Sequence, residues 1–517
     1  MRDGSFDASN ERADVLFAIV LSAVLCWGYF FLLGDVGLYL GDEGYLWYGV
    51  QRTLAGEVPL RDFQSYDPGR YSWCALFGWL GGDGILTVRA AATGFQSIGL
   101  VFAILVMSRV VRSRLALVAW AALFWAWMLQ NHRYFEPAMA SIATWFAVRL
   151  VEHQSAGRHL AAGLQAGLAG FIGRNHALYA ALACGLALLF LLWKERDPAW
   201  RRRAALWVAG GLIGFLPMWL MFLFVPGFFD SFLWSSAFSA EHPNVPYPWP
   251  WPWRTDWTAL HGWNLASTAA LSAAFLLPCV VLPSGLASTW RTPRASIPGR
   301  AVTIGATCVG LFYIHHASVR SHPAHLAECL PPILLLTLGL ASSWKRWQRW
   351  VAWSGLWLVS VVSVVEEHQT LSLFRPYRGR EPLVEFDAAG DTVRVTRQQA
   401  SRYETMTAFA RANLAADEPI LIAPNRPGLY PLLRKVSPSW WIYFLWPASE
   451  TEQRELIAAL EERRVNWALI VDKATDDKPE LLFRNTHPLV WEHLARNFEP
   501  FPARDLPTDH LVFRRKR

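Results

Sequence analysis

The sequence has few cysteines and few charged residues for a chain of 517 residues. Its six cysteines lie in or beside apolar segments, none follows Cys329, and no two are spaced as Cys-x-x-Cys. This pattern excludes a disulfide framework in the C-terminal part and offers no redox or metal motif built on cysteine. Only 17% of the residues are charged, which is low for a soluble domain. The residues after 366 also lack a glycine-rich phosphate-binding loop.

Apolar sequence dominates instead. The chain is 53% hydrophobic and contains 29 tryptophans, and apolar runs of about 20 residues are long enough to cross a bilayer as helices. Such runs lie near residues 15–33, 85–108, 115–130, 137–151, 177–193, 204–226, 264–283, 300–317, 325–342 and 347–364, with a shorter run near 159–172. We therefore predict a mainly α-helical, polytopic transmembrane bundle of about 11 spans, whose first span is not cleaved.

Lysine and arginine gather in clusters between these runs, which accounts for the net charge of +7 without nucleic acid as a partner. With a cytoplasmic N-terminus, every cluster falls on the same side, as the positive-inside rule requires. The clusters are Arg109–Arg114, Arg158, Lys194–Arg203, Arg291–Arg300 and Lys345–Arg349. The sequence thus predicts a multi-pass protein of an inner or plasma membrane, with its C-terminal domain extracytoplasmic.

Two domains are expected: a transmembrane domain at 1–365 and a small soluble α/β domain at 366–517. Strand-like runs at 419–423 and 467–471 flank a helical stretch at 450–464, a pattern typical of α/β domains. Pro427-Gly428 is interpreted as a turn. The strip at 246–253, which reads PYPWPWPW, is either an interfacial aromatic anchor or a platform on which a sugar or lipid stacks.

The first outer loop carries the most informative chemistry. Asp42 and Glu43 follow the first span, and then Leu46, Trp47, Val50 and Leu54 recur at helical spacing. This spacing predicts an amphipathic helix along the membrane surface, with both carboxylates at its N-terminus, where the helix dipole favours them. Asp42 is then a helix cap, a general base, or with Glu43 a ligand of a divalent cation such as Mg²⁺ or Mn²⁺.

The loop continues with Gly56-x-x-Pro59-x-Arg61-Asp62-Phe63 and Asp67-Pro68-Gly69. Together with Asp42-Glu43 and the helix, this signature resembles the GT-C superfamily of membrane glycosyltransferases, which includes protein O-mannosyltransferases, the lipid A aminoarabinose transferase and mycobacterial arabinosyltransferases. The resemblance implies transfer of a hexosyl or pentosyl group from a polyprenyl-phosphate donor to a glycan, lipid or protein acceptor at the extracytoplasmic face. Asp67-Pro68-Gly69 departs from the consecutive prolines of many relatives, which leaves the sugar open.

The resemblance also implies residue roles. Asp42 is expected to be the catalytic base, and Glu43 to assist it or to bind a cation. The leaving phosphate needs cationic groups at the outer face; the candidates are Arg320, His322, His325, Arg174, His132 and Arg133. Further candidates in the first loop are Tyr45, Arg61, Asp62, Asp67 and Arg70. Each cation alone could be an ordinary interfacial charge.

Three other interpretations fit the sequence less well. The histidines of the segment 315–325 lack a compact zinc-binding spacing, so a metal site is not predicted there. A transporter or lipid flippase would need polar residues along its spans, and the spans have few. A non-catalytic membrane scaffold with an outer binding domain fits residues 366–517 but leaves the acidic loop unexplained.

Overall fold

The computed structural model describes residues 8–129, 135–195, 198–242, 251–291, 299–367, 382–474, 478–502, 506 and 509–516. The chain folds into two compact units, each assembled from three segments. Unit 1 contains residues 1–33, 92–225 and 249–377, and unit 2 contains residues 34–91, 226–248 and 378–517. The first loop is therefore part of the same unit as the C-terminal segment, although the transmembrane runs separate them in sequence.

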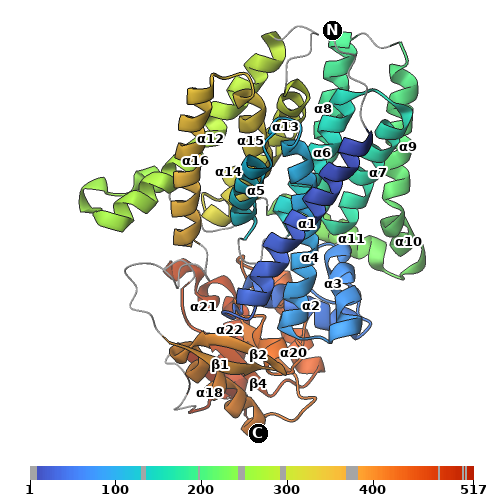
Figure 1. The fold of residues 1–517 in the computed structure, drawn as a ribbon. Helices are drawn as coiled ribbons and strands as arrows, with labels where there is room; N and C mark the ends of the chain where they lie inside the picture. The colour runs from blue at the N-terminus through green and yellow to red at the C-terminus, as the bar shows by residue number, and fades with distance from the viewer. Residues whose placement is uncertain are drawn as a thin grey trace, which may run out of the picture. The chain divides into compact units, whose positions relative to one another are not determined.

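Unit 1 is a bundle of helices, most of them long and apolar (Figure 1). They are α1 (Ala8–Leu33), α4 (Ile85–Met107, whose first turns belong to unit 2), α5 (Arg114–Met128), α6 (Phe135–Glu152), α7 (Ala156–Ile172), α8 (Arg174–Glu195), α9 (Trp200–Gly214), α10 (Leu216–Phe224), α12 (Gly262–Arg291), α13 (Arg300–Tyr313), α14 (His315–Val319), α15 (Pro323–Ala341) and α16 (Arg346–Glu367). Nine of the eleven apolar runs each lie on one of these helices, whereas the run at 204–226 divides into α9 and α10 and the run at 300–317 into α13 and α14.

Fewer helices meet the length and apolarity expected of a membrane span than the sequence predicts. Among the described residues, six helices are long and apolar enough to cross a membrane, or seven if the bent pair α9 and α10 is one span. That pair bends by 47° just before Pro217, where the ring removes a helix hydrogen bond. Helices α5 and α7 have only 15 and 17 residues. A multi-pass helical bundle is confirmed, and the count of eleven stays a prediction.

Helix α7 packs against α9 with the backbones in close approach. A Cβ added to Gly163 would lie 1.9 Å from the carbonyl oxygen of Trp207, and one added to Gly214 would lie 2.1 Å from that of Leu164. Small residues at such crossings are typical of helices that associate inside a membrane, where dispersion forces replace the hydrophobic effect. The weak run at 159–172 thus forms a helix that packs in the manner of a membrane helix.

Unit 2 combines short helices with two small sheets. Its elements are α2 (Asp42–Leu54), α3 (Pro68–Gly81), α11 (Phe228–Glu241), β1 (Leu383–Ala388), β2 (Asp391–Thr396), α18 (Arg397–Asn413), β3 (Ile420–Ala423), α19 (Leu429–Leu432), α20 (Glu450–Glu462), β4 (Trp467–Val471), α21 (Phe483–Thr486), α22 (Pro488–Asn497), β5 (Phe498–Pro500) and β6 (His510–Arg515). The larger sheet has the order β3-β4-β6-β5, in which only β3 and β4 are parallel. The predicted strands and helix are confirmed as β3, β4 and α20.

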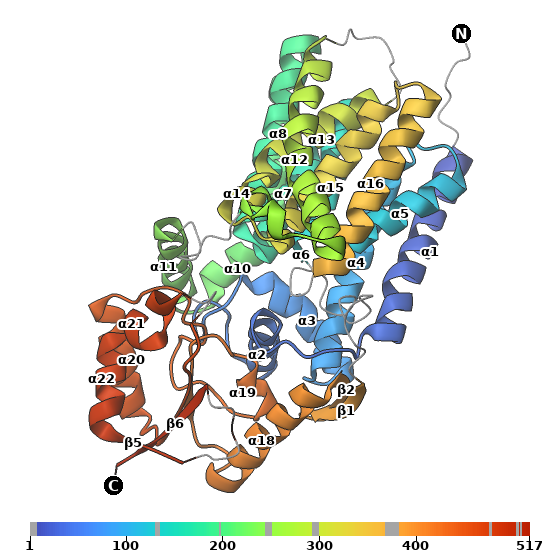
Figure 2. The ribbon, with the colours of Figure 1, turned by 90° about the vertical axis from the view of Figure 1, so that its left-hand side faces the viewer.

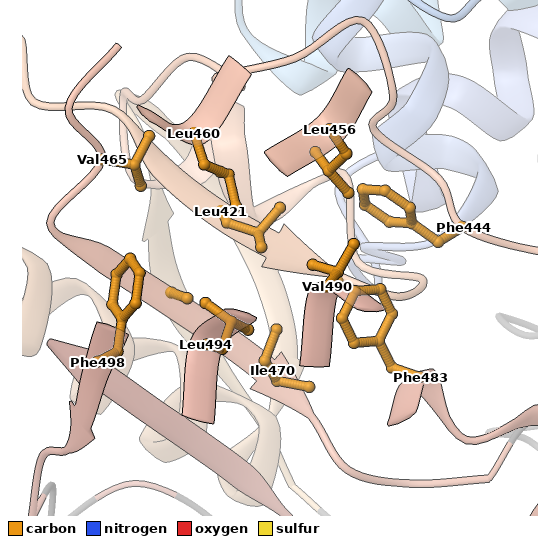
Figure 3. Packing of buried hydrophobic residues seen from close by; sticks show 12 residues of the cluster. Leu421, Phe444, Leu456, Leu460, Val465, Ile470, Phe483, Val490, Leu494 and Phe498 are labelled. Atoms are coloured by element: carbon orange, nitrogen blue, oxygen red, sulfur yellow. The ribbon is translucent and has the colours of Figure 1, made fainter. Parts of the chain in front are cut away.

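One hydrophobic core joins this sheet to its helices. Figure 2 shows α20, α21 and α22 stacked beside β6, and Figure 3 shows their side chains meeting those of the strands. Leu456 and Leu460 of α20 and Leu494 of α22 contact the face that carries Leu421 and Ile470. These side chains are at most 2% exposed, so burial of apolar surface accounts for the packing of the two helices on the sheet.

The first loop is built into unit 2 by backbone contacts. Val36 pairs with Arg394 of β2, and Gly37 donates a hydrogen bond of 2.8 Å to the Arg394 carbonyl. A Cβ on Gly44 would lie 2.3 Å from the Cα of Gly428, so α2 and the segment at Gly428 touch backbone to backbone. The sequence indicated only a turn at Pro427-Gly428. In the structure this segment also contacts α2.

Candidate active site

Asp42 is the first residue of α2, and Gly41 occupies the N-cap position without a side-chain hydrogen bond. Asp42 is therefore not the capping residue of this helix. Its carboxylate still lies where the helix dipole favours a negative charge. Asp42 is half-buried, whereas the next eight residues, from Glu43 to Val50, are buried. A carboxylate that is fixed at a helix start and partly accessible can accept a proton from a bound hydroxyl.

Helix α2 is covered by protein over most of its length, because residues 43–50 are buried and residues 51–54 are half-buried. Tyr48 packs on Tyr430 at a ring separation of 5.2 Å, and the Trp47 indole donates a hydrogen bond of 2.8 Å to the Asp83 carbonyl. The apolar stripe in the sequence marked one buried face of α2. The glycines at 44 and 49 let neighbouring segments cover the other faces.

Glu43 is held in a buried ion pair with Arg89. The guanidinium donates from Nε to Oε1 at 2.6 Å and from Nη2 to Oε2 at 2.8 Å, and Oε2 also accepts from the Tyr39 N–H at 3.2 Å. Arg89 in turn donates to the carbonyls of Gly34 and Gly37. The two side chains are only 5% and 10% exposed. This bidentate geometry fixes the start of α2, and with it the backbone of Asp42.

A cluster of tyrosines and one arginine lies around Tyr45, one helical turn after Asp42. Tyr45 contacts Tyr66 at a ring separation of 5.1 Å and Tyr443 at 5.7 Å. The Arg70 guanidinium lies 4.5 Å above the Tyr66 ring in cation–π geometry. Burial raises the pKa of the Tyr45 phenol well above 10; Asp42 adds to this shift and Arg70 opposes it. Both charges therefore act on the same phenol.

Asp67 and Arg70 start the next helix of unit 2. Asp67 is the N-cap residue of α3, and Pro68 follows at the first helical position, where a missing N–H costs nothing. Both Asp67 and Arg70 are buried, at 6% and 5% exposure. The buried Arg70 thus gives unit 2 a positive charge that acts on the same Tyr45 phenol as Asp42.

Arg61 and Asp62 form an ion pair within a turn. Arg61 donates from Nε and Nη2 to the Asp62 carboxylate at 2.8 Å each, and Asp62 accepts from the Val58 N–H at 2.7 Å. This hydrogen bonding by Arg61 lowers the pKa of Asp62 below its usual value. The Arg-Asp-Phe part of the signature thus closes a loop, and Phe63 anchors it with 1% exposure.

A second group of polar residues lies in unit 1, where α8 and α15 begin and α13 ends. Arg174 is the first residue of α8, and a helix N-terminus is a ready site for an anion. His176 is fully buried; its Nδ1 lies 3.1 Å from the Tyr313 hydroxyl, and its ring stacks on His316 at 5.9 Å. This end of unit 1 is therefore lined by polar aromatic rings.

Arg320 and His322 occupy the connection between α14 and α15. Arg320 is half-buried. His322 is the N-cap of α15, and its Nδ1 accepts a hydrogen bond of 3.2 Å from the Ala324 N–H. The other nitrogen, Nε2, then carries the proton of the neutral ring. The candidates His132 and Arg133 lie outside the described residues.

His325 is brought together with a residue that sequence reasoning missed. Its Nδ1 lies 3.7 Å from Oε1 of Glu328, whose Oε2 lies 2.5 Å from Nδ1 of His316. Glu328 has no exposed surface. The spacing of His325 and Glu328, three residues apart on a helix, is the sequence signal that could have indicated this pairing.

The fold of this chain is similar to that of solved structures. The crystal structure of ArnT from Cupriavidus metallidurans bound to undecaprenyl phosphate aligns over 98% of each chain, with 14% sequence identity and a TM-score of 0.52. The apo state of ArnT aligns over the same shares, with 14% identity and a TM-score of 0.53. The chain has a GT-C fold. This confirms the architecture that the first-loop resemblance implied.

The archaeal oligosaccharyltransferase AglB from Archaeoglobus fulgidus, solved with an inhibitory peptide and a dolichol-phosphate, aligns over 99% of this chain and 75% of its own, with 11% identity and a TM-score of 0.46. No protein-family model and no curated protein sequence matches the chain.

Within this GT-C fold, Arg89 is the most informative residue that was not among the candidates from the sequence. It lies early in a long apolar run, where a lone arginine is costly and often functional. That unusual position was the available signal, but its partner Glu43 is 46 residues away in sequence. Only the folded chain brings the two together.

Proposed function

We propose that this GT-C protein is a membrane glycosyltransferase that moves a sugar from a polyprenyl-phosphate donor to an acceptor at the extracytoplasmic face. Asp42 is the general base that takes the proton of the acceptor hydroxyl. The glycosidic oxygen departs with the lipid phosphate, so the reaction needs a base on one side of the sugar and a positive site on the other.

The observation that carries this proposal is the state of the acidic pair. Glu43 is fully engaged by Arg89, and Asp42 is half-buried at the first position of α2 with no capping role. In this proposal Glu43 fixes the start of α2 and Asp42 accepts the proton. With both Glu43 oxygens occupied by hydrogen bonds, cation binding by the pair has less support than it had from the sequence.

Arg174, Arg320 and His322 of unit 1 are the groups proposed to bind the donor phosphate. A charge-assisted hydrogen bond from a guanidinium to phosphate is strong and can be bidentate. The solved ArnT complex contains undecaprenyl phosphate, which supports a lipid phosphate as the ligand of this fold.

Incubation of the purified chain with a panel of radiolabelled polyprenyl-phosphate sugars tests the function. We expect transfer of label to an envelope acceptor, or slow hydrolysis of one donor without acceptor, and both should be lost in Asp42→Asn. Glu57→Gln, which alters a carboxylate paired with Arg52 at the far end of α2, should keep the activity. If no donor is consumed by the well-folded protein, the proposal is wrong.

A further inference from the structure

Three buried side chains with metal-binding atoms converge at the junction of α14 and α15. His316, His325 and Glu328 each offer one ligand atom, and these atoms lie within 4.8 Å of one another. Two of the distances are 2.5 Å, from His316 Nδ1 to Glu328 Oε2, and 3.7 Å, from His325 Nδ1 to Glu328 Oε1. Ligands of a tetrahedral zinc ion at bond lengths near 2.0 to 2.1 Å are about 3.3 Å apart. The three groups need to move by only about 1 Å to match that spacing.

Burial makes this group unusual for an ion pair. Glu328 has no exposed surface, and the two histidines are at most 9% exposed. A carboxylate removed from water needs a compensating charge. A bound cation would supply that charge.

We propose that His316, His325 and Glu328 bind a divalent transition metal of the zinc class. Two imidazoles and one carboxylate are a common zinc ligand set, with a fourth position left for water or another ligand. Mg²⁺ and Ca²⁺ prefer sites built from oxygen, so the histidines argue against them. This site is separate in sequence and in chemistry from the acidic pair Asp42-Glu43, and it does not depend on the proposed function.

The site also has a structural consequence. His316 and His325 flank the chain segment that carries Arg320 and His322. A metal that joins the five-residue helix α14 to α15 closes this short loop and restricts the positions of both side chains. If the proposed function holds, the metal acts on phosphate binding by ordering this loop, without taking part in the transfer itself.

Metal content of the purified full chain in detergent tests the proposal. The protein is stripped with a chelator, reloaded with Zn²⁺, freed of unbound metal and analysed by mass spectrometry for zinc. We expect about one zinc per chain in the wild type and at least a tenfold loss in Glu328→Gln and His316→Gln. His315→Gln is the matched control, because it changes the adjacent histidine and leaves the three ligands in place.

Two further measurements guard against misfolded variants. Zn²⁺ should raise the Tm of the wild type and of His315→Gln, and leave the Tm of Glu328→Gln unchanged. Co²⁺ in place of zinc should give visible absorption in the wild type that is absent in Glu328→Gln. A wild type that retains no zinc and shows no shift of Tm, or variants that retain zinc as the wild type does, would overturn the proposal and leave a plain histidine–glutamate pair.

Discussion

At the level of single residues, Asp42 is the side chain whose chemistry can be separated from its structural effect. Asp42→Asn keeps the shape and removes the negative charge. Because the Asp42 side chain is not the cap of α2, we expect the fold and donor binding to be retained. Turnover should fall by about 10²- to 10⁴-fold, the usual contribution of a general base. Turnover and donor binding are measured on the same preparation, and wild-type turnover in this variant would remove Asp42 from the mechanism.

Glu43 differs from its neighbour because its role is to hold Arg89. Glu43→Gln leaves the guanidinium buried without a counter-charge, and breaking such a pair typically costs about 3 to 5 kcal/mol. Thermal melting in detergent should therefore show a large loss of Tm. Glu450→Gln, which breaks an exposed pair with Arg454, should cost less than about 1 kcal/mol. Full recovery of Glu43→Gln with excess Mg²⁺ or Mn²⁺ would contradict the ion-pair role and favour a cation site.

At the level of elements, α2 touches the segment at Gly428 backbone to backbone, and a substitution of Gly44 tests this contact. Gly44→Ala would place a methyl group 2.3 Å from the Gly428 Cα, so one backbone must move. We expect a loss of about 1 to 3 kcal/mol or more in unfolding free energy, as for other overpacked sites.

The control for this substitution is Gly185→Ala in α8, where an added Cβ meets no atom within 4 Å. It should be neutral or stabilising by up to about 1 kcal/mol, because alanine favours helix over glycine. Equal melting temperatures for the two alanine variants would show that the α2 contact is looser than described.

His487 makes the helical layer of the C-terminal sheet sensitive to pH. Its ring stacks on Phe483 at 4.7 Å, and burial lowers its pKa from 6.5 to about 4. The unfolded chain therefore binds a proton between pH 6.5 and 4 that the folded chain does not. Stability from this residue is full above pH 6.5, declines as the pH falls and is lost below about 4, with a total of roughly 3 kcal/mol.

The measurement is Tm as a function of pH between 7.5 and 5. The wild type should lose Tm on acidification across this range, and His487→Phe, which keeps an aromatic ring, should lose less. Identical pH profiles for the two proteins would show that His487 does not titrate on unfolding.

At the level of the whole molecule, the arginine clusters predict an N-in and C-out topology. Single cysteines are introduced at Ser155, Ser343 and Glu404, which are exposed in the structure, in a background without the exposed native Cys279. In intact cells, Ser155→Cys and Ser343→Cys should resist a membrane-impermeant thiol reagent, and Glu404→Cys should react. Labelling of Ser155→Cys from outside, with no labelling of Glu404→Cys, would reverse the orientation.

Much of the fold was predictable because a membrane protein must satisfy its backbone hydrogen bonds within each span. The apolar runs therefore marked the helices directly, and the runs at 419–423 and 467–471 marked β3 and β4. The first-loop signature predicted the GT-C fold. The short strands β1, β2, β5 and β6 were not anticipated, since they are partly exposed and lack a long apolar pattern.

The sequence by itself thus determined the helical membrane class, the α/β elements near the C-terminus and the candidate base Asp42. Tertiary structure alone decided which polar residues meet. Glu43 finds Arg89 across 46 residues, Gly44 meets Gly428, and His316 faces Glu328. Local pattern reflects hydrogen bonding and burial within a few residues, whereas these pairings depend on chain segments that pack together only after the helices have formed.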